Sequence, residues 1–185
     1  MKLRNFLFAL LAMFVALVTF VPSDASALEP GKDGYYNTGT GVRTKSVAFA
    51  TFQVYAISHD MKGPLPPKSK QAVIDADVDK RFSWRMMRDV DLEKIQKALR
   101  DAFAMNGYSD AGKINAFLGA FTTELKEKSG VSISYNAQAK TVSVWVQSGG
   151  KSATIAGADF MKAVWSIWFG KIDQPSLGDA LISRM

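Results

Sequence analysis

A β-rich run between Gly39 and Ile57 constrains the fold of this chain more than any other feature. β-Branched and aromatic residues such as Phe49 and Val54 dominate it, and these residue types favour extended strands. Its length suits two strands or one long bent strand. The run also carries Arg43 among apolar neighbours, where an inward-facing cation is unfavourable unless it has a partner. The planar guanidinium suits a carboxylate or another delocalised oxyanion. The alternative is an ordinary exposed arginine on an edge hairpin.

The N-terminus has the three parts of a secretory signal peptide. Lys2 and Arg4 form a basic start, residues 6–21 are almost continuously apolar, and Ala25-Ser26-Ala27 is a cleavage motif. We expect cleavage after Ala27, which would leave residues 28–185 as one periplasmic or secreted domain. The apolar run of about 16 residues is shorter than the roughly 20 that span a bilayer, so a retained anchor is the less favoured alternative.

Composition excludes several kinds of chemistry. The chain has no cysteine, which rules out thiol catalysis and thiolate metal sites, and its single histidine, His59, argues against a His-rich metal site or a Ser-His-Asp triad. We therefore predict no metal and no cofactor, and we interpret His59 as a polar surface or edge-strand residue. The 23 Lys and Arg residues against 17 Asp and Glu are dispersed along the chain. We expect no nucleic-acid partner, but a modest attraction to anionic ligands or membrane surfaces.

The remaining chain alternates between helix and strand patterns. We expect a short helix over 71–77, a strand over 81–87, helices from Asp91 to Gly107 and from Ser109 or Asp110 to Gly130, strands over 131–135, 142–146 and 150–155, and helices from Asp159 to Gly170 and from Pro175 onward. This order predicts an α+β fold with helices on one face of a mainly antiparallel sheet. The four tryptophans, at positions 84, 145, 165 and 168, are expected in the core. Because no second long apolar segment follows, we predict no stable membrane insertion after signal cleavage. We also expect the protein to be a monomer.

Five short motifs stand in a distinctive order within residues 35–183. They are Gly41-Val42-Arg43-Thr44-Lys45, Val54-Tyr55-Ala56, Met87-Arg88-Asp89-Val90-Asp91, Gly157-Ala158-Asp159-Phe160 and Trp165-Ser166-Ile167-Trp168-Phe169-Gly170. In this order and spacing they resemble the bacterial branch of the chalcone isomerase-like family. The resemblance implies an open-faced β-sandwich, in which a mainly antiparallel sheet carries a layer of helices on one face and a ligand cleft lies between them.

The resemblance also implies a choice between two activities. Plant chalcone isomerases of this family close chalcones to flavanones, whereas related proteins bind fatty acids without known catalysis. Arg43 matches the arginine that holds the developing phenolate in the enzymes. Tyr55 stands where the enzymes have a threonine, as in the fatty-acid-binding relatives.

Most other polar positions of the enzymes are apolar in this chain. Their tyrosine and asparagine would fall near Leu92 and Leu99, and their late-helix hydroxyl at Ser166 or Ile167. Losing several such groups would severely compromise ring closure. No catalytic residue is assigned on this basis.

The leading hypothesis is therefore non-catalytic binding of a fatty acid or similar amphiphilic carboxylate, with Arg43 and Tyr55 as the ligand-binding residues. The alternative is an intramolecular lyase or isomerase acting on a chalcone-like or enone substrate, with a phenolic compound as the ligand. A third possibility is a structural or interaction module without a small ligand.

Overall fold

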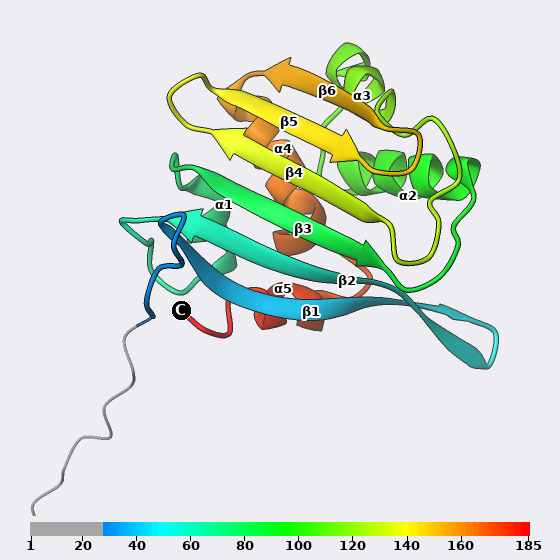
Figure 1. The fold of residues 1–185 in the computed structure, drawn as a ribbon, viewed down its shortest axis with the longest axis horizontal. Coiled ribbons are helices and arrows are strands. Elements are labelled where there is room, and N and C mark those ends of the chain that lie inside the picture. Colours follow the sequence, from blue (N-terminus) through cyan, green and yellow to red (C-terminus); the bar gives the residue numbers. More distant parts are fainter. Residues whose placement is uncertain (1–27) are drawn as a thin grey trace, which may run out of the picture.

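The computed structural model of the chain describes residues 28–185, so the expected signal peptide over 1–27 lies outside the described residues. Six strands form one antiparallel sheet in which each strand pairs with the next along the chain (Figure 1). The strands are β1 (Tyr35–Val47), β2 (Ala50–Lys62), β3 (Lys80–Met86), β4 (Gly130–Asn136), β5 (Thr141–Val146) and β6 (Lys151–Ala156). The helices are α1 (Lys70–Asp75), α2 (Leu92–Met105), α3 (Ala111–Leu118), α4 (Ala158–Phe169) and α5 (Pro175–Ala180).

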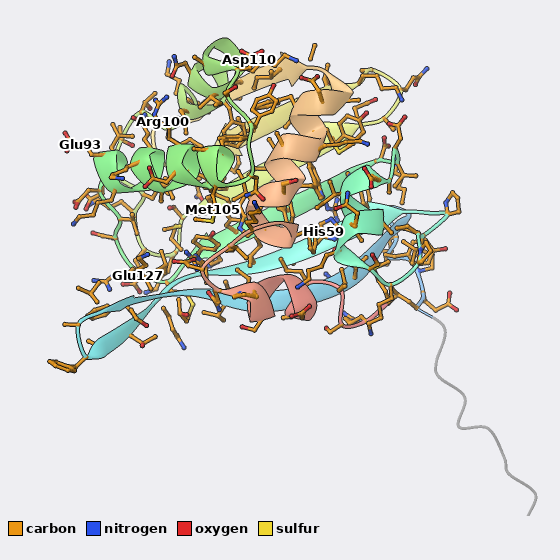
Figure 2. All side chains as sticks on the ribbon, turned by 180° about the vertical axis from the view of Figure 1, so that it is seen from behind. His59, Glu93, Arg100, Met105, Asp110 and Glu127 are labelled. Carbon is orange, nitrogen blue, oxygen red and sulfur yellow. The ribbon has the colours of Figure 1, made fainter. Side chains whose placement is uncertain are left out.

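The described helices all lie on one face of the sheet, and the other face is uncovered (Figures 1 and 2). Side chains on the covered face alternate with exposed ones along the strands, as in the pattern of β3, where Phe82, Trp84 and Met86 are buried. The α+β fold and the open-faced sheet are confirmed. None of the helices within residues 28–185 is long and apolar enough to cross a lipid bilayer.

The β-rich run forms two long strands rather than one bent strand. β1 and β2 are 13 residues each and meet at a tight turn at Ala48 and Phe49. Their pairing places Arg43 directly opposite Tyr55. Because directly opposed residues of an antiparallel pair project to the same face, the register alone brings these two side chains together.

The glycines of the first motif allow a helix to lie against β1. A Cβ on Gly39 would lie 2.2 Å from the carbonyl oxygen of Ala180, and a Cβ on Gly41 would lie 2.6 Å from a methyl carbon of Leu177. Both contacts are closer than side chains tolerate. The sequence Gly-Thr-Gly is therefore a packing surface for α5, which holds the C-terminal segment next to the edge strand (Figure 1).

The prediction for α3 was too long. The helix begins after Asp110, whose carboxylate accepts a hydrogen bond from the Lys113 N–H, but it ends at Leu118 instead of continuing to Gly130. Leu125 instead forms an isolated β-bridge with Val90 and is buried. The apolar spacing of residues 114–125 thus reflects burial of an irregular segment as well as of a helix, and spacing alone does not separate the two.

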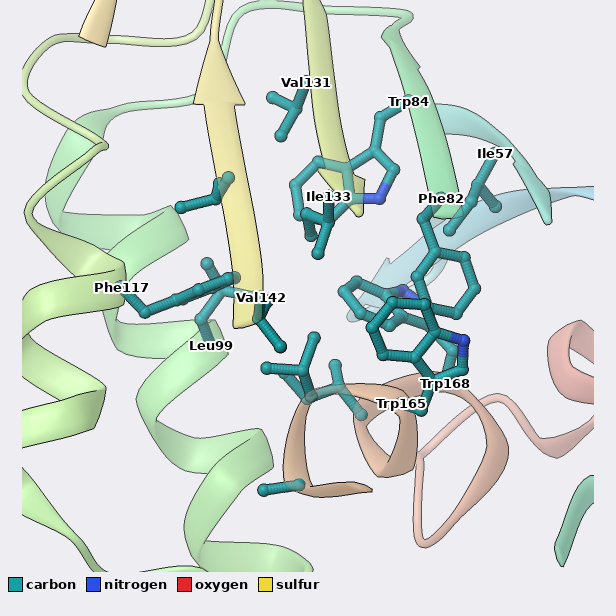
Figure 3. Packing of buried hydrophobic residues seen from close by; sticks show 14 of the residues in the cluster. Ile57, Phe82, Trp84, Leu99, Phe117, Val131, Ile133, Val142, Trp165 and Trp168 are labelled. Atoms are coloured by element: carbon teal, nitrogen blue, oxygen red, sulfur yellow. The ribbon is translucent and has the colours of Figure 1, made fainter. Parts of the chain in front are cut away.

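The core lies between the sheet and α4. Trp165 and Trp168 of α4 pack on Phe82 of β3, with ring centroids 5.1 and 4.5 Å away (Figure 3). Trp84 stacks on Tyr55 at 4.7 Å with its ring nearly parallel. Trp145 departs from the prediction, because it lies on the uncovered face of β5 and is half exposed.

His59 is fully buried, so its interpretation as a surface or edge-strand residue was wrong. It lies on the helix-covered side of β2 (Figure 2), where its Nε2 accepts a hydrogen bond from the Trp165 indole N–H at 2.9 Å and its Nδ1 lies 2.7 Å from the Thr38 hydroxyl. Burial, with a contribution from Lys80, holds the pKa of His59 well below 6.5. The neutral ring therefore joins β1, β2 and α4 through polar contacts inside the core.

Candidate functional site

A cleft of about 640 Å³ opens between the outer half of the β1–β2 hairpin and helix α2. The end of α4 and the segment 171–173 form its remaining wall. Met105, at the end of α2, marks this region when the molecule is seen from the helical side (Figure 2). The volume falls within the range typical of small-molecule sites, about 300–1,000 Å³.

Arg43 forms the polar corner of the cleft. One guanidinium nitrogen lies 2.6 Å from a carboxylate oxygen of Asp173, and the other terminal nitrogen donates to Oε1 of Gln174 at 3.2 Å. Lys45 contacts the second Asp173 oxygen at 3.0 Å. Two cations thus share one carboxylate, which leaves the corner with one positive charge in excess.

The Asp173 carboxylate is ionised at neutral pH. Its partial burial alone would raise the pKa, but the hydrogen bonds and charges of Lys45 and Arg43 outweigh that effect and lower it. Gln174 steadies the same corner, since its side chain accepts from the Thr44 N–H at 2.9 Å and donates to the Val42 carbonyl at 2.9 Å.

Tyr55 lines the inner end of the cleft beside Arg43. Its hydroxyl oxygen accepts a hydrogen bond from the Trp168 indole N–H at 3.1 Å. Burial raises the pKa of Tyr55, although Trp168 and Arg43 act in the opposite direction, so the phenol stays protonated. Within residues 28–185 its own O–H has no protein acceptor, and this leaves one donor available to a ligand.

The structure brings the two residues that the sequence singled out into one cleft, and it also places the positions compared with the plant enzymes. Leu99 and Ile167 line the cleft with apolar side chains. Leu92 packs against the core outside the cleft lining. The hydroxyl of Ser166 points away and donates to the Lys162 carbonyl, so the late-helix position that faces the cleft is Ile167.

The mouth of the cleft combines apolar and cationic side chains. Phe52 and Val47 of the hairpin line it, and the guanidinium of Arg88 lies 4.7 Å from the centre of the Phe52 ring. Lys171 contributes a further cation from the opposite wall. Among the described residues neither Arg88 nor Lys171 forms an ion pair.

Sequence reasoning missed Asp173 and Gln174. They lie about 130 residues from Arg43 in the chain, in an irregular segment before α5, and carry no local motif. Phe52 was part of the β-rich run, but its place at the cleft mouth depends on how far the hairpin extends past the sheet. In the described part of the chain, no three His, Cys, Asp or Glu side chains group closely enough to hold a metal ion.

The model of a family described as chalcone isomerase-like matches residues 26–181. No curated protein matches the chain. Among solved structures, a fatty-acid binding protein of Arabidopsis thaliana is similar, with a TM-score of 0.65 and 16% sequence identity; the match covers 84% of this chain and 90% of that one. At this identity the structural likeness establishes a shared fold.

Proposed function

Because the chain belongs to the chalcone isomerase-like family, we propose that its cleft binds a fatty acid or a similar amphiphilic carboxylate without catalysing a reaction. The observation that carries the proposal is a cleft with a mainly apolar surface in which Arg43, Lys45 and Asp173 form a corner with excess positive charge. Its other charged lining residues come from residues 88–91, from α2 and from Lys171. The fatty-acid binding protein with the same fold supports this ligand class.

The geometry suits a carboxylate head and a hydrocarbon tail. The head would meet the unused donors of Arg43 and the free O–H of Tyr55, while Lys45 balances Asp173. The tail would lie along Leu99, Ile167 and their apolar neighbours, each buried methylene contributing about 0.8 kcal/mol. Affinity would then come mainly from the tail, and orientation from the corner.

Export is a separate part of the proposal. It is supported by the basic start, the apolar run and the Ala25-Ser26-Ala27 motif. N-terminal sequencing of protein recovered from the expressing cells should give Leu28 as the first residue. Full-length protein retained in the cytosol would contradict the export.

The first test of the ligand is native mass spectrometry of the purified protein, which should reveal a co-purified acyl species or a complex after incubation with a fatty acid. Arg43→Ala should then weaken binding of the acid by about 1.5–3 kcal/mol, the range for a hydrogen bond to a charged group, and leave the methyl ester little affected. Arg43→Lys should restore part of the loss, because a point charge does not reproduce the planar fork. The matched control is Arg85→Ala, which removes an exposed arginine from the open face of β3.

The same experiments distinguish the proposed binding function from the alternatives, an isomerase and a module without a small ligand. Equal losses for acid and ester would mean that Arg43 supports the fold rather than the ligand. Conversion of a chalcone or enone by the purified protein would favour the isomerase alternative. Absence of any bound acyl species after exposure to fatty acids would contradict the proposal.

A further inference from the structure

The tip of the β1–β2 hairpin is an exposed apolar segment. Every residue from 45 to 53 is exposed, and the hairpin extends beyond the rest of the sheet (Figure 1). Val47 is 60% exposed and Phe49 is fully exposed. Isolated exposed apolar residues are common, but a contiguous apolar tip marks a surface that meets a partner.

The turn at the tip lacks the residue types that usually stabilise a two-residue hairpin turn in water. Two-residue hairpin turns favour Asn-Gly or Asp-Gly, which tolerate left-handed backbone and hydrate well. Here the turn is Ala48-Phe49, and Ala48 has a φ of 51°, a conformation that non-glycine residues rarely adopt. An apolar turn with this uncommon conformation at an exposed tip indicates a role other than closing the hairpin.

The charges on the hairpin itself have one sign, and each acidic residue of the neighbouring cleft wall is paired with a lysine or an arginine. No Asp or Glu occurs between Asp33 and Asp60, whereas the hairpin carries Arg43 and Lys45. Arg88 packs on Phe52 without an ion-pair partner among the described residues, and Lys171 across the cleft is likewise unpaired there. An apolar tip flanked by free cations complements a bilayer surface, which offers hydrocarbon beneath anionic headgroups.

We propose that this hairpin tip docks on a lipid bilayer that contains anionic lipids, with Phe49 inserted below the headgroups and Arg88 and Lys171 in contact with them. Because Val47 and Phe52 of the same hairpin line the cleft, docking places the cleft mouth at the bilayer. An acyl chain can then pass between bilayer and cleft along an apolar surface. Docking itself requires no bound fatty acid, so it stands or falls independently of the proposed ligand.

Sedimentation with vesicles tests the proposal directly. The protein should bind vesicles of phosphatidylcholine and phosphatidylglycerol more tightly than vesicles of phosphatidylcholine alone, and added salt should weaken the binding. Phe49→Ser should weaken binding about tenfold or more, because one large apolar side chain no longer enters the bilayer. Trp145→Ser is the control: it removes a half-exposed aromatic side chain from the open face of β5, away from the tip, and should leave vesicle binding unchanged. Every variant shares the same N-terminus, so residues 1–27 contribute equally to all.

A fluorescent reporter locates the contact. In a Trp145→Phe background, Phe49→Trp places a tryptophan at the tip, while the other three, at positions 84, 165 and 168, are buried. Its emission should shift to the blue when anionic vesicles are added.

Two results would overturn the proposal. Vesicle binding that is unchanged by Phe49→Ser, with no emission shift at position 49, would show that the tip does not enter the bilayer. A dimer in solution that dissociates on Phe49→Ser, without vesicle binding, would assign the tip to a second copy of the chain.

Discussion

Replacing Asp173 by asparagine should strengthen the binding of fatty acids. Asp173 contacts Arg43 at 2.6 Å and Lys45 at 3.0 Å, and it therefore occupies the cations that a ligand carboxylate would use. The Asp173→Asn change keeps the size of the side chain and removes its charge. Gln174 still holds the guanidinium in place through its hydrogen bond to Arg43.

The expected gain in carboxylate binding follows from the solvent exposure of the side chains that form the two ion pairs. The Asp173 side chain is 45% exposed, that of Lys45 is 59% exposed and that of Arg43 is 18% exposed. The Lys45 pair is therefore expected to contribute about 0.2–1 kcal/mol, and the less exposed Arg43 pair to lie at the upper end of that range. Releasing both cations should favour a ligand carboxylate by about 0.5–1.5 kcal/mol, or roughly two- to tenfold in Kd. A methyl ester of the same acid lacks the charge and should bind as it does to the unaltered protein.

Titration calorimetry with dodecanoate and methyl dodecanoate measures both quantities. The double variant Arg43→Ala/Asp173→Asn should lose most of the gain, because the main cation that Asp173 releases is then missing. Asp101→Asn is a suitable control, since Asp101 also lines the cleft but pairs with Lys97 on α2. Weaker binding of the acid to Asp173→Asn, or an equal gain for acid and ester, would refute the reasoning about this corner.

Three further predictions concern the fold and are measured by denaturant unfolding. The pKa of His59 is well below 6.5 in the folded protein, so the unfolded chain binds more protons than the folded protein as the pH falls below 6.5. The free energy of unfolding should therefore decrease from about pH 7 to about pH 5. His59→Gln should flatten that decrease. Lys80→Met should destabilise the protein by about 1–3 kcal/mol, because the buried ammonium donates to three carbonyl oxygens at the end of α1 that would lose their partner; equal stability would contradict this role. Gly39→Ala should cost about 1–3 kcal/mol by forcing α5 away from β1, and an unchanged midpoint would show that α5 shifts freely.

The sequence predicted those features that depend on local patterns. Alternation of apolar residues placed β3, β4 and β5, and the β-rich run favoured two strands or one long bent strand, of which the structure has two. The expectation that Arg43 and Tyr55 share one cleft came from the family resemblance and not from a local pattern. The apolar identity of Leu99 also carried over, because that side chain lines the cleft as expected for a site without the enzymes' polar groups.

The errors have a common physical cause, which is that tertiary contacts override local signals. His59 looked like a surface residue because the sequence does not show that Thr38 and Trp165 satisfy both ring nitrogens inside the core. The apolar stripe that ends at Leu125 looked helical, but its last part is buried through a bridge to Val90. The pairing of Arg43 with Asp173 joins two distant segments and has no signature in either.

The two halves of the β1–β2 hairpin have different surroundings. Its inner half places Arg43 and Tyr55 in the cleft, and its outer half carries Phe49 into solvent. One pair of strands thus connects the polar corner of the cleft with the apolar tip.

The most direct test of the central claim is a crystal structure of the protein with a bound fatty acid. We expect the carboxylate within hydrogen-bonding distance of the Arg43 guanidinium and the Tyr55 hydroxyl, with the tail between the hairpin and α2. A carboxylate pointing to bulk solvent, or a ligand seated in the groove on the open face between β1 and β3, would contradict the account.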